Sequence, residues 1–231
     1  MTGLRILHVD DEPDIREVVE LSLGLDPAFT VKSCASGGDA LATVANWRPD
    51  LILCDVMMPV MDGPATLARL RQSPETARIP VVFMTARAQA REMEHFKSLG
   101  ATGVIAKPFD PLTLASFVRH QLHTAGITAL RDGFLKRLRA DAMALATCRR
   151  ELAADSASDA ALEQTRSFAH ALAGAAGIFG FQQIGAAAAA LEKVTEGPPI
   201  GSLDAIERAL DSLLAYIDDE WQRALVPVGN A

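Results

Sequence analysis

The first half of the chain alternates short apolar runs with helical patterns. Five runs have the length and composition of buried strands. They are Arg5–Val9, Thr30–Cys34, Asp50–Cys54, Pro80–Met84 and Gly103–Ala106. Helical spacing fills residues 13–24, 37–46, 64–72, 88–99 and 110–123. This alternation predicts an α/β domain whose parallel, doubly wound sheet has helices on both faces.

The strand pattern stops near Gly126, and four amphipathic stripes follow. Their apolar positions are Phe134, Leu138, Ala142, Leu145 and Leu152; Phe168, Leu172, Ala175 and Phe179; Ile184, Ala188, Leu191 and Val194; and Leu203, Ile206, Leu210, Leu213, Ile217 and Trp221. Gly180 and the Gly197-Pro198-Pro199 segment separate the last three stripes. We therefore expect an all-α, antiparallel four-helix bundle. The boundary is predicted at Thr124–Ile127, with domains at 1–125 and 126–231.

Composition narrows the class of protein. The 231 residues are 49% hydrophobic, enough for two ordinary domains with well-formed cores. The net charge of −7 divides into −3 for residues 1–125 and −4 for 126–231, which argues against a nucleic-acid-binding surface. Three scattered cysteines predict no disulfide framework. With no signal peptide and no run of ~20 apolar residues, the sequence predicts a cytoplasmic protein without a membrane segment.

Polar residues mark the ends of four predicted strands: Asp10 with Asp11, then Asp55, Thr85 and Lys107. Because parallel strands end at one edge of a sheet, these side chains should lie together. Three clustered carboxylates repel one another unless a cation neutralises them, and oxygen ligands suit Mg²⁺. The set fits phosphoryl transfer, with Asp55 as the nucleophile that forms an acyl phosphate. The alternative is a helix cap at Asp10-Asp11 and a surface lysine at Lys107.

These segments resemble the receiver domain of two-component response regulators. The likeness covers residues 4–122 and is carried by Val9-Asp10-Asp11-Glu12, Asp55 through Gly63, Thr85-Ala86 and Lys107-Pro108-Phe109. It implies a flavodoxin-like fold of five strands, and a domain that catalyses its own Mg²⁺-dependent phosphorylation and dephosphorylation at Asp55. It also implies Mg²⁺ ligation by Asp11, Asp55 and the Met57 carbonyl, with Asp10 acting through water. Val104 stands where the family often has an aromatic switch residue, so signalling by aromatic rotation is not implied.

His170 is the candidate nucleophile of the second half. The stripe Phe168, Leu172, Ala175 and Phe179 is roughly 60° wide, and His170 points about 180° from its centre, toward solvent. Gly174 and Gly177 lie beside it, although a mid-helix glycine costs roughly 1 kcal/mol relative to alanine. Either they leave a smooth platform for a partner protein, or they pack against the alanine-rich third helix.

The segment resembles the histidine-containing phosphotransfer (Hpt) domain over residues 127–224. His170, Leu172, Gly174 and Gly180 match its motif. The resemblance implies a four-helix bundle in which His170 forms a high-energy phosphoramidate. Ala173 replaces the family's lysine, and Arg166 and Lys193 are the candidates to supply the missing charge.

The leading interpretation is a phosphorelay intermediate. Asp55 takes phosphate from a sensor histidine kinase or an Hpt partner, and His170 exchanges phosphate with a receiver aspartate. The alternative is an adaptor or scaffold controlled by phosphorylation of Asp55, whose bundle carries no phosphate. A detached tail of a hybrid histidine kinase is disfavoured by the start at Met1. No glycine-rich nucleotide loop is present, so a signalling protein is expected rather than an autonomous kinase. A homodimer through the receiver is a further option.

Overall fold

A computed structural model describes residues 3–87, 89–154, 159–196 and 203–225. The chain divides into two compact units, Met1–Ile127 and Thr128–Ala231. This division lies at the end of the predicted boundary segment. Each unit has hydrophobic core clusters of its own.

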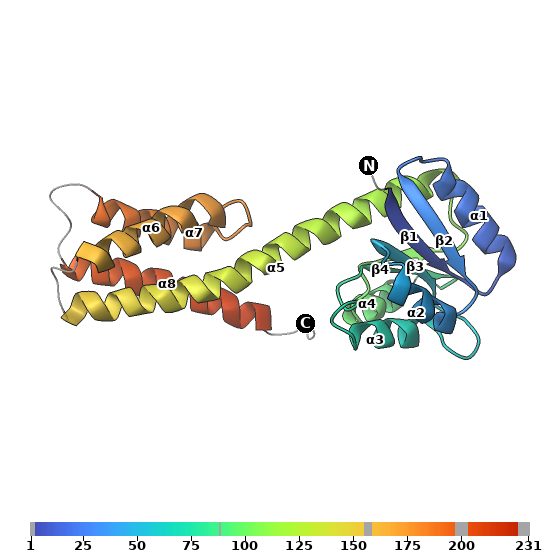
Figure 1. The fold of residues 1–231 in the computed structure, drawn as a ribbon, viewed down its shortest axis with the longest axis horizontal. Coiled ribbons are helices and arrows are strands. Elements are labelled where there is room, and N and C mark those ends of the chain that lie inside the picture. The colour runs from blue at the N-terminus through green and yellow to red at the C-terminus, as the bar shows by residue number, and fades with distance from the viewer. Residues whose placement is uncertain (1–2, 88, 155–158, 197–202, 226–231) are drawn as a thin grey trace. The chain divides into compact units, whose positions relative to one another are not determined.

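The first unit is built on one parallel sheet, as predicted (Figure 1). Its strands are β1 (Leu4–Val9), β2 (Phe29–Cys34), β3 (Leu51–Asp55), β4 (Val81–Thr85) and β5 (Gly103–Ala106). They are arranged in the order β2-β1-β3-β4-β5, the flavodoxin-like order. The chain direction across the sheet reverses between β1 and β3, the point at which such folds place their ligand sites. Asp55 and Thr85 are the last residues of β3 and β4.

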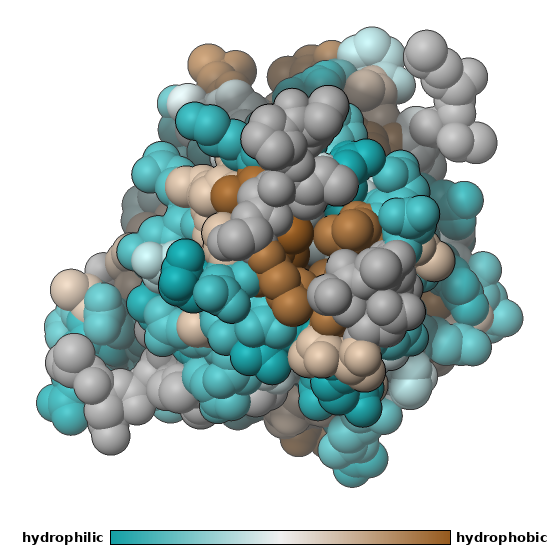
Figure 2. Space-filling model, turned by 90° about the vertical axis from the view of Figure 1, so that its left-hand side faces the viewer, coloured by the Kyte–Doolittle hydropathy of each residue, from teal (hydrophilic) through white to brown (hydrophobic). Residues whose placement is uncertain are grey.

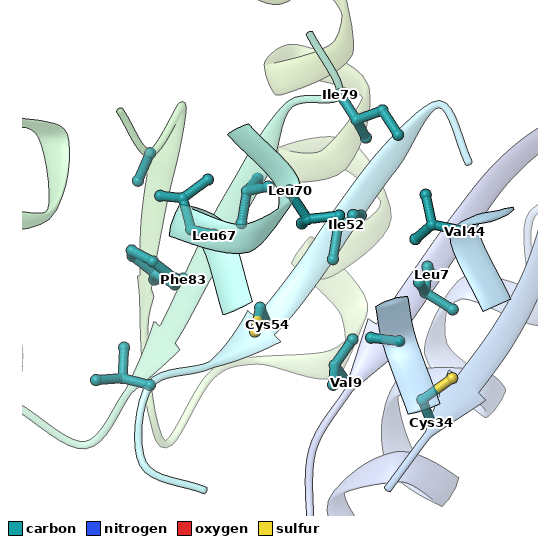
Figure 3. Packing of buried hydrophobic residues seen from close by; sticks show 14 of the residues in the cluster. Leu7, Val9, Cys34, Val44, Ile52, Cys54, Leu67, Leu70, Ile79 and Phe83 are labelled. Carbon is teal, nitrogen blue, oxygen red and sulfur yellow. The ribbon is translucent and has the colours of Figure 1, made fainter. Parts of the chain in front are cut away.

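Helices cover both faces of this sheet, as the alternating pattern predicted. They are α1 (Pro13–Gly24), α2 (Gly37–Asn46), α3 (Gly63–Arg71), α4 (Ala90–Ser98) and the first part of α5 (Pro111–Ala154). α1 and α5 pack on one face through residues such as Leu23 and Val118. α2, α3 and α4 pack on the other, where Val44, Leu67 and Leu70 lie against the strands (Figure 3). The predicted start of the fourth helix at residue 88 lies outside the described residues.

The expected separation of two helices near the boundary is wrong. The sequence predicted a helix at 110–123 and a separate helix carrying Phe134 to Leu152, but α5 runs unbroken from Pro111 to Ala154, 44 residues. No proline follows Pro111 within this segment, and alanine, leucine and arginine favour the helix. Gly126 and Gly133 face open space and cost only roughly 1 kcal/mol each, so they do not end it.

The second unit is helical, as predicted. The later part of α5 packs with α6 (Asp159–Ala176), α7 (Gln182–Thr195) and α8 (Leu203–Leu225) around one core. Fully or almost fully buried side chains from all four helices fill it, among them Leu145, Leu172, Leu191 and Leu210. Gly180 takes the left-handed conformation, with φ of 82°, in the turn between α6 and α7. The predicted break at Gly197-Pro198-Pro199 lies outside the described residues.

The buried face of α6 differs from the expected stripe. Ala161, Thr165, Ala169, Leu172 and Ala176 are buried. Phe168, Ala175 and Phe179 are only partly buried against the core. Small residues explain the shift, because they let α7 come close: a Cβ at Gly185 would lie 3.6 Å from the Ala176 Cβ. Helix packing therefore rotated the core face toward alanines rather than toward the two phenylalanines.

Two further expectations concern the cysteines and the absence of a membrane segment. Cys34, Cys54 and Cys148 are buried and free, so the expected absence of a disulfide among them is confirmed. Within the described ranges, no helix combines the length and the apolar character needed to cross a bilayer. Seen from the left-hand side of Figure 1, the surface is mostly hydrophilic around a smaller hydrophobic area (Figure 2). That distribution fits helices that bury their apolar faces inward.

Candidate functional site

Three strand ends form a buried ionic cluster in the first unit. Asp10 follows β1 and is fully buried, Asp55 ends β3 and is 6% exposed, and Lys107 follows β5. The Lys107 Nζ lies 2.6 Å from Asp10 Oδ2 and 2.5 Å from Asp55 Oδ1. The ammonium thus holds together two carboxylates that would otherwise repel each other. The surface-lysine alternative for Lys107 is wrong, because its side chain is only 12% exposed.

Burial and charge set the electrostatics of this cluster. Burial raises the pKa of Asp55, and the charge of Asp10 raises it further, while Lys107 opposes both. Burial lowers the pKa of Lys107, but its hydrogen bonds to Asp10 and Asp55 outweigh burial, so the pKa is raised. Each carboxylate also accepts a backbone N–H: Glu12 N lies 3.0 Å from Asp10 Oδ1, and Met57 N lies 2.7 Å from Asp55 Oδ2. Both carboxylates are therefore held in fixed orientations.

Asp11 and Thr85 complete the edge of the sheet. Asp11 is half-buried, and Arg16 of α1 donates from Nη1 to the carbonyls of Asp10 (2.7 Å) and Asp11 (3.0 Å). Thr85 is buried, and its Oγ1 accepts from the Arg87 N–H at 3.0 Å. The Lys107 N–H donates to the Thr85 carbonyl at 2.7 Å, so the ends of β4 and β5 are joined. Sequence reasoning did not identify Arg16, whose helical position gives no signal of this role.

Gly63 closes the loop that follows Asp55. A Cβ at Gly63 would lie 2.5 Å from the Asp55 carbonyl oxygen, so only glycine fits there. The Gly63 N–H donates to the Val56 carbonyl at 3.1 Å, and Asp62 caps α3 by accepting from the Ala65 N–H at 2.7 Å. The loop is thereby held against the end of β3, beside the carboxylate.

The donor set at this edge suits a hard divalent cation. Asp10, Asp11, Asp55 and the Met57 carbonyl offer only oxygen, the ligand type that Mg²⁺ prefers. In this arrangement no three His, Cys, Asp or Glu side chains of the described ranges converge as a metal centre. A cation is nevertheless already part of the cluster, because the Lys107 ammonium lies between Asp10 and Asp55. The chemistry of the pocket fits Mg²⁺ once that ammonium moves.

His170 stands on the exposed side of α6, as its helical phase predicted. Its side chain is 80% exposed, and its Nδ1 lies 2.6 Å from Glu192 Oε1 on α7. The hydrogen bond to Glu192, together with its negative charge, raises the pKa of His170. This contact orients the ring and leaves Nε2 as the ring nitrogen on the other side. Sequence reasoning missed Glu192, because a contact across 22 residues depends on how α6 and α7 pack.

The residues around His170 bear on two open questions: why glycines lie beside it, and whether Arg166 supplies the missing positive charge. A Cβ at Gly174 or Gly177 would meet no atom within 4 Å outside the local helix, so packing against the third helix does not require glycine at either position. Arg166, a candidate replacement for the missing lysine, donates from Nε to the Thr195 carbonyl at 2.9 Å and pairs with Glu163. Its guanidinium is therefore engaged at the end of α7.

Comparison with known proteins agrees with the two halves of the chain. A family model of the response regulator receiver domain matches residues 6–119, and a model of the Hpt domain matches residues 129–224. Response regulator Rre1 of Synechocystis sp. is 35% identical over 119 residues, which are 52% of this chain and 52% of that protein.

The phosphate regulon transcriptional regulatory protein PhoB of Pseudomonas aeruginosa is 32% identical over 126 residues, 54% of this chain and 55% of that protein. The chain thus spans about half the length of the curated relatives it matches. Among solved structures, the chemotaxis response regulator CheY4 of Vibrio cholerae is 33% identical. That match covers 52% of this chain and 99% of CheY4, with a TM-score of 0.49. Residues 6–119 are therefore a response regulator receiver domain and residues 129–224 an Hpt domain, and the chain belongs to the two-component signalling proteins that join the two.

Proposed function

We propose that this protein is a phosphorelay intermediate that carries phosphoryl groups on Asp55 and on His170. Its receiver and Hpt domains are signalling and phosphotransfer modules and give it a two-component phosphorelay role. The observation that carries the finer proposal is the Lys107 ammonium between Asp10 and Asp55, at the meeting point of three strand ends. It prepares a positive charge beside the carboxylate that would accept the phosphoryl group.

At Asp55 a carboxylate oxygen attacks the phosphorus of a donor phosphohistidine. The new P–O bond forms as the P–N bond breaks, and the departing imidazole nitrogen takes up a proton. Lys107 lies 2.5 Å from Asp55 and can follow the charge that moves onto the phosphoryl oxygens. The Met57 N–H, at 2.7 Å from Oδ2, keeps the other carboxylate oxygen in place during attack.

Asp10, Asp11, Asp55 and the Met57 carbonyl are the groups that would hold Mg²⁺. When bound, the ion supplies positive charge that neutralises the carboxylates and the incoming phosphoryl oxygens. The backbone N–H groups of Glu12 and Met57 orient the carboxylates that would meet the ion.

At His170 the nucleophile is Nε2 of the neutral imidazole. It forms a P–N bond as the P–O bond to a receiver aspartate breaks, and the reverse step returns the phosphoryl group. Glu192 accepts from the Nδ1–H and so keeps the lone pair on Nε2. High exposure of the ring suits attack on a group held by another domain.

Acid and base stability of the label tests this proposal. The full chain would be labelled from a phosphorylated histidine kinase, and Asp55→Asn and His170→Gln compared with wild type. We expect Asp55→Asn to lose the base-labile acyl phosphate and keep the acid-labile label when a phosphorylated receiver is the donor. His170→Gln should show the opposite pattern.

The adaptor alternative gives a different result. It predicts base-labile label at Asp55 and no acid-labile label on wild type, whichever receiver is offered. Label retained by Asp55→Asn at the wild-type base-labile level would contradict the receiver assignment itself. The partners implied by the two domains are histidine kinases and other receiver-domain proteins.

A further inference from the structure

His8 is a buried histidine on β1 to which the proposed function gives no role. Its side chain is fully buried, and neither ring nitrogen has a hydrogen-bond partner among the described residues. Buried polar groups in native proteins nearly always have a partner, so an unpaired imidazole in a sheet calls for an explanation.

The position of His8 links it to the ionic cluster. Residues two apart on a strand point to the same face, so His8 lies beneath Asp10. Its Nε2 is 3.8 Å from Asp10 Oδ2, which is too long for a hydrogen bond. That same oxygen is the one that Lys107 holds at 2.6 Å. His8 and Lys107 therefore both face Asp10 Oδ2, and in this structure Lys107 donates the hydrogen bond to it.

The ring is suited to donate a hydrogen bond while remaining uncharged. The ring is fully buried and has no hydrogen-bonded partner in the described part of the chain to stabilise a positive charge, so the uncharged imidazole is favoured. A neutral ring has one N–H donor and one acceptor nitrogen. Ser33, the register partner of His8 on β2, shares its face of the sheet and also has a buried hydroxyl without a partner. The tautomer with hydrogen on Nε2 has its donor on the ring nitrogen that lies 3.8 Å from Asp10 Oδ2.

We propose that His8 is a positioning residue for Asp10, and that its Nε2–H binds Asp10 Oδ2 when Lys107 leaves that oxygen. Lys107 would leave when a divalent cation enters the cluster or when a phosphoryl group on Asp55 attracts the ammonium. This inference rests on the proposed phosphorylation of Asp55. His8 is unpaired while Lys107 holds Asp10, and it gains a hydrogen bond once the cation or phosphoryl group is present. It therefore favours binding of the cation and phosphorylation of Asp55.

The hydrogen-bond partners of Asp10 Oδ2 explain why His8 would matter. Without His8, the departure of Lys107 would leave a buried carboxylate oxygen with no protein donor, which is costly. A movement of the imidazole by about 1 Å closes the 3.8 Å gap to hydrogen-bond length. Groups that orient a metal ligand from outside its coordination shell typically change metal affinity by about 10–100-fold when removed.

Two substitutions in the full chain separate positioning from packing. His8→Leu keeps the volume and removes the donor, whereas His8→Gln keeps an N–H donor. Titration with Mg²⁺ alone, followed by calorimetry, is expected to show about tenfold weaker affinity for His8→Leu. His8→Gln should recover most of the affinity. His123→Leu, at an exposed histidine on α5, is the matched control and should bind Mg²⁺ as wild type does.

The stability of the Mg²⁺-free receiver should not fall in His8→Leu, in contrast to its Mg²⁺ affinity. Removing an unpaired buried polar group should leave the Mg²⁺-free His8→Leu receiver as stable as wild type or more stable, as measured by urea unfolding. Wild-type Mg²⁺ affinity in a folded His8→Leu, or equal losses in His8→Leu and His8→Gln, would overturn the proposal.

The experiments distinguish the proposed role of His8 from the proposed phosphorylation of Asp55. Mg²⁺ affinity is measured without phosphate, so it reports on His8 even if Asp55 accepts none. The lifetime of the base-labile label then gives the second readout, and we expect it to be shorter in His8→Leu. An unchanged lifetime together with unchanged affinity contradicts the role of His8 and leaves the role of Asp55 intact.

Discussion

The two candidate phosphate carriers of this chain are built in opposite ways. Asp55 is buried at the end of β3, in a cluster that draws on β1, β3 and β5. His170 is 80% exposed on one helix, and its Nδ1 contacts the Glu192 carboxylate. A buried carboxylate needs charges from the protein, because few water molecules can hydrate it. An exposed imidazole is already hydrated and needs only to be oriented.

This difference predicts how each site responds to change. In the receiver cluster each charged side chain is paired with one of opposite charge, so removal of one leaves a buried charge unpaired. In the bundle the groups around His170 lie in water, where single interactions are weak. Substitutions should therefore have large effects at the receiver site and modest ones at His170.

The largest effect is expected from Lys107→Met. Loss of the ammonium leaves Asp10 and Asp55 unneutralised and removes a charge aimed at the phosphoryl group. Labelling by acetyl phosphate should slow by about 100-fold, the usual cost of a lost preorganised donor. Acid-labile labelling of His170 by a phosphorylated receiver should not change. Lys97→Met, at an exposed lysine on α4, is the control. A wild-type rate in Lys107→Met would remove the main argument for the buried cluster as the acceptor site.

The next largest effect is expected on stability, where alanine substitutions at two glycines should have opposite signs. Gly63→Ala places a Cβ 2.5 Å from the Asp55 carbonyl and should destabilise the receiver by about 1–3 kcal/mol. Gly174→Ala adds a Cβ in open space within a helix and should stabilise the bundle by about 1 kcal/mol. Urea unfolding followed by Trp47 fluorescence reports on the receiver, and Trp221 reports on the bundle. Changes of the same sign in both variants would contradict the contrast.

A smaller effect is expected at Glu192. Its hydrogen bond and charge raise the pKa of His170, so Glu192→Gln should lower that pKa. Because the neutral ring is the nucleophile, the pH midpoint for phosphate acceptance should move to lower pH. The rate at high pH should fall about two- to tenfold, since one orienting hydrogen bond is lost. Glu163→Gln, at an exposed glutamate on α6, should leave the profile in place. A shift to higher pH would show that Glu192 does not act on the ring as the geometry indicates.

The smallest effect is expected from Ala173→Lys, which restores the charge that the Hpt motif usually has. Acceptance of phosphate at His170 should speed up about two- to fivefold, the range of exposed charge pairs. Arg166 is engaged with Thr195 and Glu163, so it does not already fill this role. Gln183→Lys, at an exposed position on α7, is the control for added positive charge. No change in Ala173→Lys would mean that another cation serves the phosphoryl group.

Much of the receiver could be predicted because its pattern is local. Short apolar runs bounded by polar residues gave its five strands with ends within one residue, and parallel strands must end at one edge. Asp10, Asp55 and Lys107 therefore had to meet. The bundle was less predictable in detail. The core face of α6 turned toward Ala169 and Ala176, and α5 continued through the expected break, since helix packing and helix propensity outweighed the stripe pattern.

Local sequence patterns were enough to predict the order of the two domains, the residues at the strand ends and the exposure of His170. These follow from the periods of strand and helix, which each segment carries in its own residues. Only the tertiary structure placed Lys107 between two carboxylates, Glu192 against His170, and His8 unpaired beneath Asp10. Each of these contacts joins atoms whose distance depends on the packing angle or register of separate elements or on side-chain rotamers, and no local pattern encodes those quantities.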